Sequence, residues 1–238
     1  MFERGAEQVV RLDGATVILT PSLPTVPHLN SVFVHADVGA DAVEAIAAAH
    51  LDGLGNHRVV IDGEATGARL RPELEARGWT AYGLLHLDRD GTLPPPEADV
   101  LAEEVPYGHV RGLREEWLRT DWALGEPELQ ECLAADERIF AGSPPRAFAV
   151  FEQGRPVSYA LLLDGGRDGM LEDVYTTPGA RGRGLSAAAI AAVLHASRAE
   201  RHEAVFVPTD ADGRASALYE RLGFAPLTVQ RIFSRPAP

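Results

Sequence analysis

The sequence predicts a mixed α/β fold of the α+β type, in which helices flank a mostly antiparallel central sheet. Two observations carry this prediction. Short runs of β-favouring residues alternate with alanine-rich helical runs along the 238-residue chain. The order strand, helix, strand, helix, strand also occurs twice, once in the first 90 residues and once after residue 170.

The first part of the chain opens with a predicted hairpin. Residues 8–13 and 15–20 alternate in polarity around Asp13-Gly14, a dipeptide typical of a tight turn. A loop with three prolines follows. The remaining predicted elements of this part are a strand at 30–34, a helix at 41–51, a strand at 58–61, a helix at 72–77 that Gly78 stops, and a strand at 82–87.

A polar, acidic connector is expected at 88–106. It contains three consecutive prolines at 94–96, which favour a stiff, extended chain. We therefore predict a boundary near residue 95, with one domain at 1–95 and a second at 96–238.

The second part is expected to begin with two helices, from Val110 onward and at 128–141, the first with Leu113 and Trp117 turned inward. Strands at 148–151, 157–163 and 170–177 then form an antiparallel meander with a turn at Gln153-Gly154. The last predicted elements are a helix at 185–198, a strand at 204–207, and a helix at 215–224 with Asp212 as N-cap and Gly223 as C′.

The two parts also align with each other. A shift of 145 positions pairs residues 39–79 with 184–224 without a gap, and the identical pairs include Gly39 with Gly184 and His57 with His202. We interpret this as a degenerate internal duplication; the alternative is a small α/β cap of separate origin. The same shift aligns Asp37 of the first copy with the segment that carries the two arginines in the second copy. The negative charge of Asp37 would repel a diphosphate.

The segment Arg181-Gly182-Arg183-Gly184 lies between a strand and a helix. Glycine lets the backbone turn its N–H groups inward, where they join the unpaired donors of the first helical turn. Such a site binds anions, and two arginines that can fork onto phosphate oxygens indicate a diphosphate. A tight turn or a helix cap is the alternative interpretation of the glycines alone.

The run L-E-D-V-Y-T-T-P-x-x-R-G-R-G-L-S at 171–186, followed by a strand and by A-L-Y-E-R-L-G-F at 217–224, resembles the acyl-CoA-binding half of the GNAT superfamily of N-acetyltransferases. The resemblance covers about 146–235. It implies a GNAT-like sheet, with the first part as a smaller degenerate copy, and acetyl-CoA as co-substrate. The implied cofactor-binding residues are Val174, Tyr175, Thr176, Arg181, Gly182, Arg183, Gly184, Leu185, Ser186 and Asp212. Ser186 departs from the family pattern, which has glycine or alanine there.

The resemblance also implies catalytic roles. Tyr219 would return a proton to the departing thiolate, and Glu172 would accept the proton of the amine. Glu172 and Asp173 are neighbours on a strand and so face opposite sides of the sheet. The alternatives are structural roles: Tyr219 as a core tyrosine, and Glu172 and Asp173 as a solvated strand end. Main-chain N–H groups around Val174 would polarise the thioester carbonyl, and the acceptor would meet Glu116, Trp117 and Asp173.

Composition limits the partners. The formal charge of −13 opposes binding to nucleic acid, and the longest apolar run is far too short to span a bilayer. A cytoplasmic protein, monomeric or homodimeric, is expected. Cys132 is a single cysteine, and the eight histidines lack metal-ligand spacing, so no metal is expected. The predicted function is N-acetylation of a primary amine of a small molecule or peptide by direct attack; the alternative is a non-catalytic acyl-CoA-binding or interaction protein.

Overall fold

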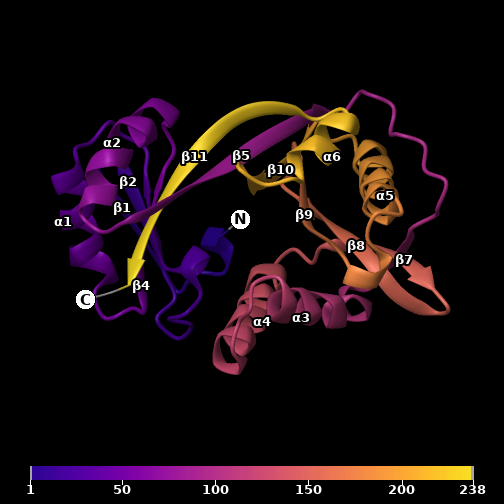
Figure 1. The fold of residues 1–238 in the computed structure, drawn as a ribbon, viewed down its shortest axis with the longest axis horizontal. Coiled ribbons are helices and arrows are strands. Elements are labelled where there is room, and N and C mark those ends of the chain that lie inside the picture. Colours follow the sequence, from indigo (N-terminus) through magenta and orange to yellow (C-terminus); the bar gives the residue numbers. More distant parts are fainter. Residues whose placement is uncertain (1, 237–238) are drawn as a thin grey trace.

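One continuous sheet organises the protein. The computed structural model describes residues 2–236. Its 11 strands lie in the order β1-β2-β3-β4-β11-β5-β10-β9-β8-β7-β6 (Figure 1). Within these residues the pairs β3–β4 and β9–β10 are parallel and the others antiparallel. The predicted fold class, a mixed α/β fold with a largely antiparallel sheet and flanking helices, is therefore confirmed.

The strands are β1 Gln8–Leu12, β2 Ala15–Leu19, β3 Ser31–Val34, β4 Asn56–Ile61, β5 Thr80–Asp90, β6 Glu103–Val105, β7 Arg146–Glu152, β8 Arg155–Asp164, β9 Gly169–Thr176, β10 Ala204–Asp210 and β11 Ala225–Pro236. The helices are α1 Ala40–Leu51, α2 Glu64–Ala76, α3 Arg111–Thr120, α4 Glu126–Phe140, α5 Leu185–Ala199 and α6 Ser216–Arg221. Short 3-10 turns include η2 Pro27–Leu29 and η4 Pro178–Ala180.

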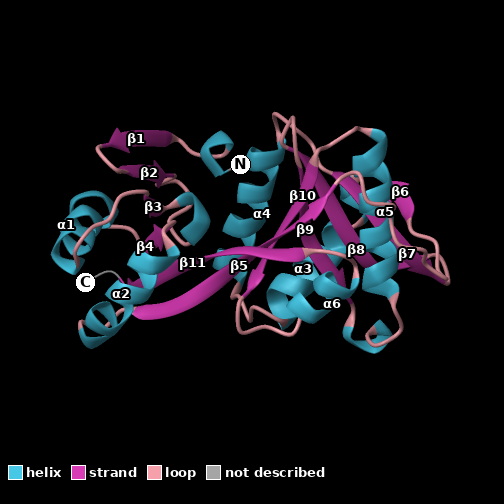
Figure 2. Cartoon of the chain, turned by 90° about the horizontal axis from the view of Figure 1, so that it is seen from above, coloured by secondary structure: helices cyan, strands magenta, loops and turns pink. Residues whose placement is uncertain are grey.

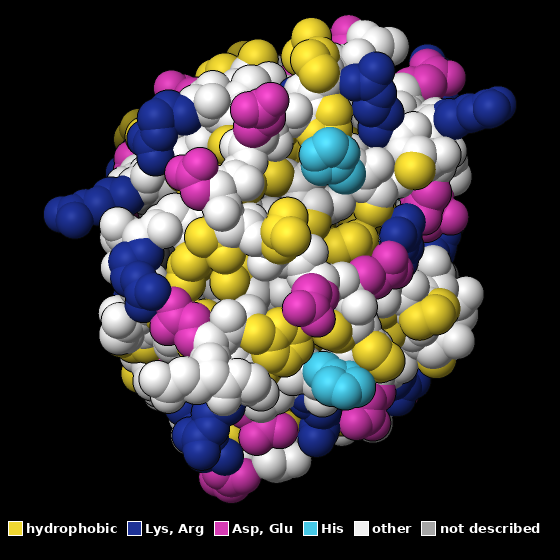
Figure 3. Space-filling view, turned by 90° about the vertical axis from the view of Figure 1, so that its right-hand side faces the viewer, with side chains coloured by type: hydrophobic (Ala, Val, Ile, Leu, Met, Phe, Trp, Pro, Cys, Tyr) yellow, Lys and Arg dark blue, Asp and Glu magenta, His cyan; other side chains and the backbone are white. Residues whose placement is uncertain are grey.

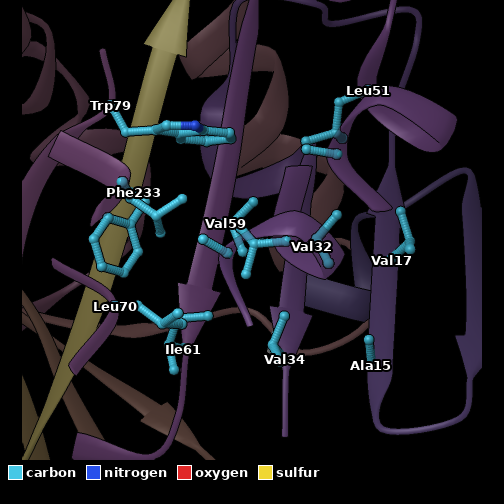
Figure 4. Close-up of a cluster of buried hydrophobic side chains, with 14 of the residues drawn as sticks. Ala15, Val17, Val32, Val34, Leu51, Val59, Ile61, Leu70, Trp79 and Phe233 are labelled. Atoms are coloured by element: carbon cyan, nitrogen blue, oxygen red, sulfur yellow. The ribbon is translucent and has the colours of Figure 1, made fainter. Parts of the chain in front are cut away.

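The first part of the chain packs α1 and α2 against β1 to β4. The core of this part contains Val32, Val59 and Leu70, which are fully buried. Phe233 of β11 is also fully buried there, although it lies more than 150 residues further along the chain (Figure 4). The last strand of the protein therefore completes the core of the first part.

Two long strands join the two parts. β5, which ends the first part, lies between β11 and β10, and β11, which ends the second part, lies between β4 and β5. Figures 1 and 2 show both strands running across the middle of the molecule. The division at residue 95 stays a prediction, and the sheet itself continues across it.

The second part has a core on each face of its strands, because alternate residues point to opposite sides. Phe148 and Leu162 pack with α5 on one face. Ala147 and Leu161 pack on the other, with Leu113 of α3. Figure 1 shows α5 on one side of β7–β9 and α3 with α4 on the other.

Three predictions about elements were wrong. Helix α2 begins at Glu64 and keeps Pro72 in its interior, where the sequence predicted a start at the proline. β5 extends to Asp90 and a short strand begins at Glu103, so the connector is shorter than predicted. Asp212 is not a helix N-cap: α6 begins at Ser216 after Ala215, and the Asp212 N–H donates to Asp210 Oδ1 at 3.0 Å in the preceding turn. The other predicted elements are present, with ends that differ by a few residues.

Surface charges are mixed on the face that Figure 3 shows. Acidic, basic and apolar side chains alternate there. Among the described residues, no helix is long and apolar enough to cross a membrane.

Candidate active site

The glycine-rich loop leads from β9 through η4 into α5. Gly182 and Gly184 have φ angles of 76° and 77°, in the left-handed region that favours glycine. In the first hydrogen bond of α5, the Ala188 N–H donates to the Gly184 carbonyl oxygen. The N–H groups of Leu185, Ser186 and Ala187 precede it and have no acceptor within the helix. These donors line a cavity of about 300 Å³, which we call the loop cavity; its walls include Thr176, Arg181, Gly182, Gly184, Ser186 and Arg221. The arrangement fits an anion such as a diphosphate.

The two loop arginines already have carboxylate partners. Arg181 donates to Asp121 Oδ2 at 2.8 Å and to the Thr176 carbonyl at 3.0 Å. Arg183 donates to Glu152 Oε2 at 3.1 Å. Any phosphate held by these guanidinium groups therefore competes with Asp121 and Glu152 for them. No local pattern in the chain indicates this competition, because both carboxylates come from distant elements.

Two further predicted residues hold the loop in place. Leu185 is buried beside Val150 and Ala188. The Ser186 hydroxyl lies 2.8 Å from the Thr176 hydroxyl, which is itself 2.7 Å from the hydroxyl of Ser158. These contacts tie the start of α5 to β8 and β9.

Strands β9 and β10 separate soon after they meet. They pair only at Gly169 with Val205 and at Met170 with Phe206. Further along β9, a bulge places Asp173 and Val174 opposite the single residue Ala160 of β8, and Asp173 has a φ of 50°. Beyond these two pairs, the edge of β9 that faces β10 makes no ladder hydrogen bonds to β10. A role for its N–H groups in polarising a thioester stays a prediction.

A larger cavity, of about 560 Å³, occupies this separation, and we call it the central cavity. Glu172 of β9 and Tyr219 of α6 both line it, so the structure brings the two predicted catalytic residues together. Burial raises the pKa of Glu172 to about 8, and the neighbouring charge of Asp173 adds to the rise. Burial, together with the charge of Glu172, also raises the pKa of Tyr219. At neutral pH Tyr219 is therefore a proton donor, and Glu172 titrates close to the physiological range.

Asp173, predicted to contact substrate, is held by a buried ion-pair network on the cavity wall. Arg114 Nη1 donates to Asp173 Oδ1 at 3.1 Å, and its Nε donates to Asp136 Oδ2 at 3.0 Å. Tyr107 also donates to Asp136 Oδ2, at 3.2 Å. Burial raises the pKa of Asp173, and the guanidinium of Arg114 opposes that rise. Asp173 is thus engaged inside the protein, which leaves Glu172 as the available carboxylate of the pair.

Sequence reasoning missed Arg114 and Asp136. Arg114 lies on a helical face beside residues predicted to point inward, and its partners are 22 and 59 positions away in the chain. Only the tertiary fold brings them together. Alone, each looks like an ordinary charged residue of a surface helix.

The remaining predicted residues divide into two groups. Trp117 lines the central cavity and stacks on Tyr175, with ring centroids 5.9 Å apart. Glu116 lies outside that cavity and accepts the hydroxyl hydrogen of Tyr175 at 3.0 Å. Asp212 is exposed and lies outside both cavities.

Residues 2–236 offer neither a clustered set of metal ligands nor an activated thiol. No group of three or more His, Cys, Asp or Glu side chains there could hold a metal ion. Cys132 is half-buried in α4, and burial raises its pKa to about 11. Its thiol is therefore protonated at neutral pH.

Comparison with known families identifies the second part of the chain. Residues 112–224 match the Acetyltransferase (GNAT) family. This range contains the glycine-rich loop, Glu172 and Tyr219. This range is therefore similar to a GNAT acetyltransferase domain; such domains support acyl transfer in general and use acetyl-CoA or another acyl-CoA. A comparison with curated protein sequences finds no match.

Solved structures share the whole fold at low sequence identity. A functionally unknown conserved protein from Staphylococcus epidermidis is 12% identical, with a TM-score of 0.72 over 97% of this chain and 94% of its own. A GCN5-related N-acetyltransferase from Sphaerobacter thermophilus is 17% identical, with a TM-score of 0.65 over 94% of this chain and 77% of its own. A tandem GNAT protein from the clavulanic acid biosynthesis pathway is 13% identical, with a TM-score of 0.55 over 87% and 75% of the two chains. At these identities the likeness establishes the fold alone.

Proposed function

We propose that this protein is an N-acetyltransferase that moves the acetyl group of acetyl-CoA to a primary amine of a small molecule or peptide. The observation that carries the proposal is the central cavity. A carboxylate with a pKa near 8 and a protonated tyrosine line the same cavity, at the point where β9 and β10 diverge. The loop cavity lies against the same strand, since Thr176 of β9 lines it.

The loop cavity supports acetyl-CoA as donor. Its left-handed glycines have nothing within 4 Å of the position that a Cβ would take, so they are required for backbone conformation and leave open space in front of the helix. Arg181 and Arg221 line this cavity together with Leu185, Ser186 and Ala187, whose N–H groups have no acceptor within the helix, so a diphosphate placed there would meet both kinds of donor.

The proposed reaction is direct attack of the amine on the thioester. The amine nitrogen forms a bond to the acyl carbon, the carbon–sulfur bond breaks, and the sulfur leaves with the bonding electron pair. Glu172 takes a proton from the amine, and the hydroxyl of Tyr219 gives one to the thiolate. A thiol has a pKa of about 8.5, below that of tyrosine, so proton transfer from Tyr219 to the thiolate is uphill. The transfer therefore requires the Tyr219 hydroxyl to lie close to the sulfur while the sulfur carries its negative charge.

We also propose that the first part of the chain is a degenerate copy of the second. Helices α1 and α5 begin at residues 40 and 185, and strands β5 and β11 begin at 80 and 225, so both pairs are 145 residues apart. Each part lends its last strand to the other. Asp37 is paired with Arg69 in the first part, and this pair occupies the region where the second part has its arginine loop.

The function is tested by thiol release from acetyl-CoA with a panel of amines, using wild type and Tyr219→Phe. We expect turnover with at least one amine and a loss of about 100-fold or more in kcat for the variant, the usual range for a general acid. Unchanged coenzyme A affinity, measured by calorimetry, controls for folding. Tight coenzyme A binding without turnover on any amine would favour a non-catalytic acyl-CoA-binding protein.

A further inference from the structure

We propose that the acceptor is a monoamine carried on an apolar, ring-bearing body, and that the first part of the chain supplies a wall that recognises this body. The inference rests on the proposed function, because it places the acceptor amine beside Glu172. It goes further by naming the class of acceptor and by giving the first part a role in the site.

The composition of the central cavity favours an apolar body. Its volume of about 560 Å³ falls in the range of pockets that bind drug-sized molecules, well above the need of a small alkylamine. Apolar and aromatic side chains from several elements line it; examples are Trp117, Trp122, Phe140, Leu163, Val174 and Val207. Burying apolar surface against these residues would supply much of the binding free energy.

The charges of the cavity favour one ammonium group over several. Four carboxylates line it, but Asp136 and Asp173 are both bound to Arg114, which is itself part of the wall. Glu172 remains available for the amine, and Asp210 is exposed. A polyamine or an aminoglycoside needs several spaced carboxylates to balance its charges, and burying extra ammonium groups among apolar side chains is costly.

Strand exchange brings residues of the first part to this cavity. Because β5 pairs with β10, Leu84 lies opposite Asp210 at the cavity. Tyr82, two residues earlier, projects to the same face of the sheet and also lines the cavity. Both positions precede residue 90, so they belong to the part of the chain that lacks the arginine loop.

Two aromatic rings of the cavity wall remain accessible. Tyr82 is 41% exposed and Trp122 is 62% exposed, one from each part of the chain. Large exposed rings beside a cavity mark a binding surface more often than isolated exposed apolar residues do. They can pack on the faces of a ring that extends from the amine, while the amine reaches Glu172.

The experiment compares 2-phenylethylamine, tryptamine, ethylamine and spermidine as acceptors, with wild type, Tyr82→Ala/Leu84→Ala and Tyr82→Phe. We expect kcat/KM for the two ring-bearing amines to exceed that for ethylamine and spermidine by about 10-fold or more. The double variant should lose about 10-fold for the ring-bearing amines, through KM, with little change for ethylamine. Tyr82→Phe should retain the preference because it keeps the ring.

Leu227→Ala is the matched control, since Leu227 is an exposed apolar residue that lies outside the cavity. An equal effect of this variant and of Tyr82→Ala/Leu84→Ala would overturn the inference, as would spermidine as the best acceptor. Coenzyme A affinity reports on folding in every variant.

A binding measurement separates this inference from the proposed function. Titration of the coenzyme A complex with tryptamine or 2-phenylethylamine, followed by calorimetry, needs no turnover. Binding that weakens about 10-fold in the double variant supports the apolar wall even if no amine is acetylated, in which case only the proposed function fails. If neither tryptamine nor 2-phenylethylamine binds the wild type, the proposed apolar wall is wrong.

Discussion

Glu172 combines a chemical role with an unusual environment. Burial raises its pKa to about 8, so only about a tenth of the protein carries the ionised base at pH 7. We therefore expect kcat/KM to rise about tenfold per pH unit below 8 and to level off above it. The acceptor should have an ammonium pKa well below 7, so that its own titration does not contribute. If Glu172→Gln keeps the same rise, another group is the base.

The same pKa predicts a pH-dependent cost in stability. The folded protein holds the proton of Glu172 up to a pH of about 8, whereas an unfolded glutamate releases it near 4.5, so the stabilising contribution of the protonated form is lost as pH rises through 8. The loss accumulates between pH 4.5 and 8, so between pH 5 and 9 wild type should lose ~4 kcal/mol of unfolding free energy relative to Glu172→Gln. Urea denaturation at both pH values measures this; identical pH dependence of the two proteins would contradict it.

At the scale of an element, the start of α5 depends on the conformation of one residue. Gly184 has a φ of 77° with open space around its missing Cβ, so the cost of alanine there is conformational. Gly184→Ala should destabilise the protein by ~1 kcal/mol and weaken coenzyme A binding several-fold, because the helical N–H groups move. Gly179→Ala is the matched control, since that glycine has equally open space and no positive φ. Thermal denaturation and calorimetry would show a difference between the variants, and equal effects would mean that the left-handed conformation is unimportant.

The loop charges give a second prediction for this element. Replacing both Arg181 and Arg183 by alanine should weaken coenzyme A binding by about 10- to 100-fold, the size expected for lost hydrogen bonds to a charged group. Asp37→Ala, at the corresponding region of the first part, should leave the affinity unchanged. Because Glu152 competes for Arg183, Glu152→Gln should bind coenzyme A slightly more tightly. Calorimetry compares all three, and equal losses from the two parts would contradict the assignment of the site to the second part.

Local features of the site could be predicted from the sequence, whereas long-range ones could not. The strand, the loop glycines and the helix after them follow from adjacent residues, and so does the Gly223 cap of α6, whose φ is 89°. Pro72 misled the prediction because proline usually begins a helix, yet α2 continues through it, with Leu70 and Leu74 buried on either side of it in the chain. The Arg114 network and the placement of Tyr82 depend on strands and helices meeting across the fold, and no local pattern encodes that.

At the scale of the whole molecule, the exchange of β5 and β11 makes the two parts depend on each other. β10 and β11 are both paired with β5, and Phe233 of β11 is buried in the core of the first part. Without residues 1–95, β10 would lose one of its two partner strands and β11 would lose both of its partners, β4 and β5, and an apolar stretch of β11 would be exposed. The central cavity would also lose the wall formed by Tyr82 and Leu84.

We therefore predict that the fragment 96–238 does not fold alone, although it contains the whole range matched by the GNAT family. The fragment should aggregate or show weak secondary structure by circular dichroism, because unpaired strand edges and buried apolar residues become accessible. Co-expression with the fragment 1–95 should restore a soluble complex that binds coenzyme A, since that fragment returns β5 to its place between β10 and β11. A monomeric, cooperatively folded 96–238 with full coenzyme A affinity would show that the exchanged strands do not couple the two parts.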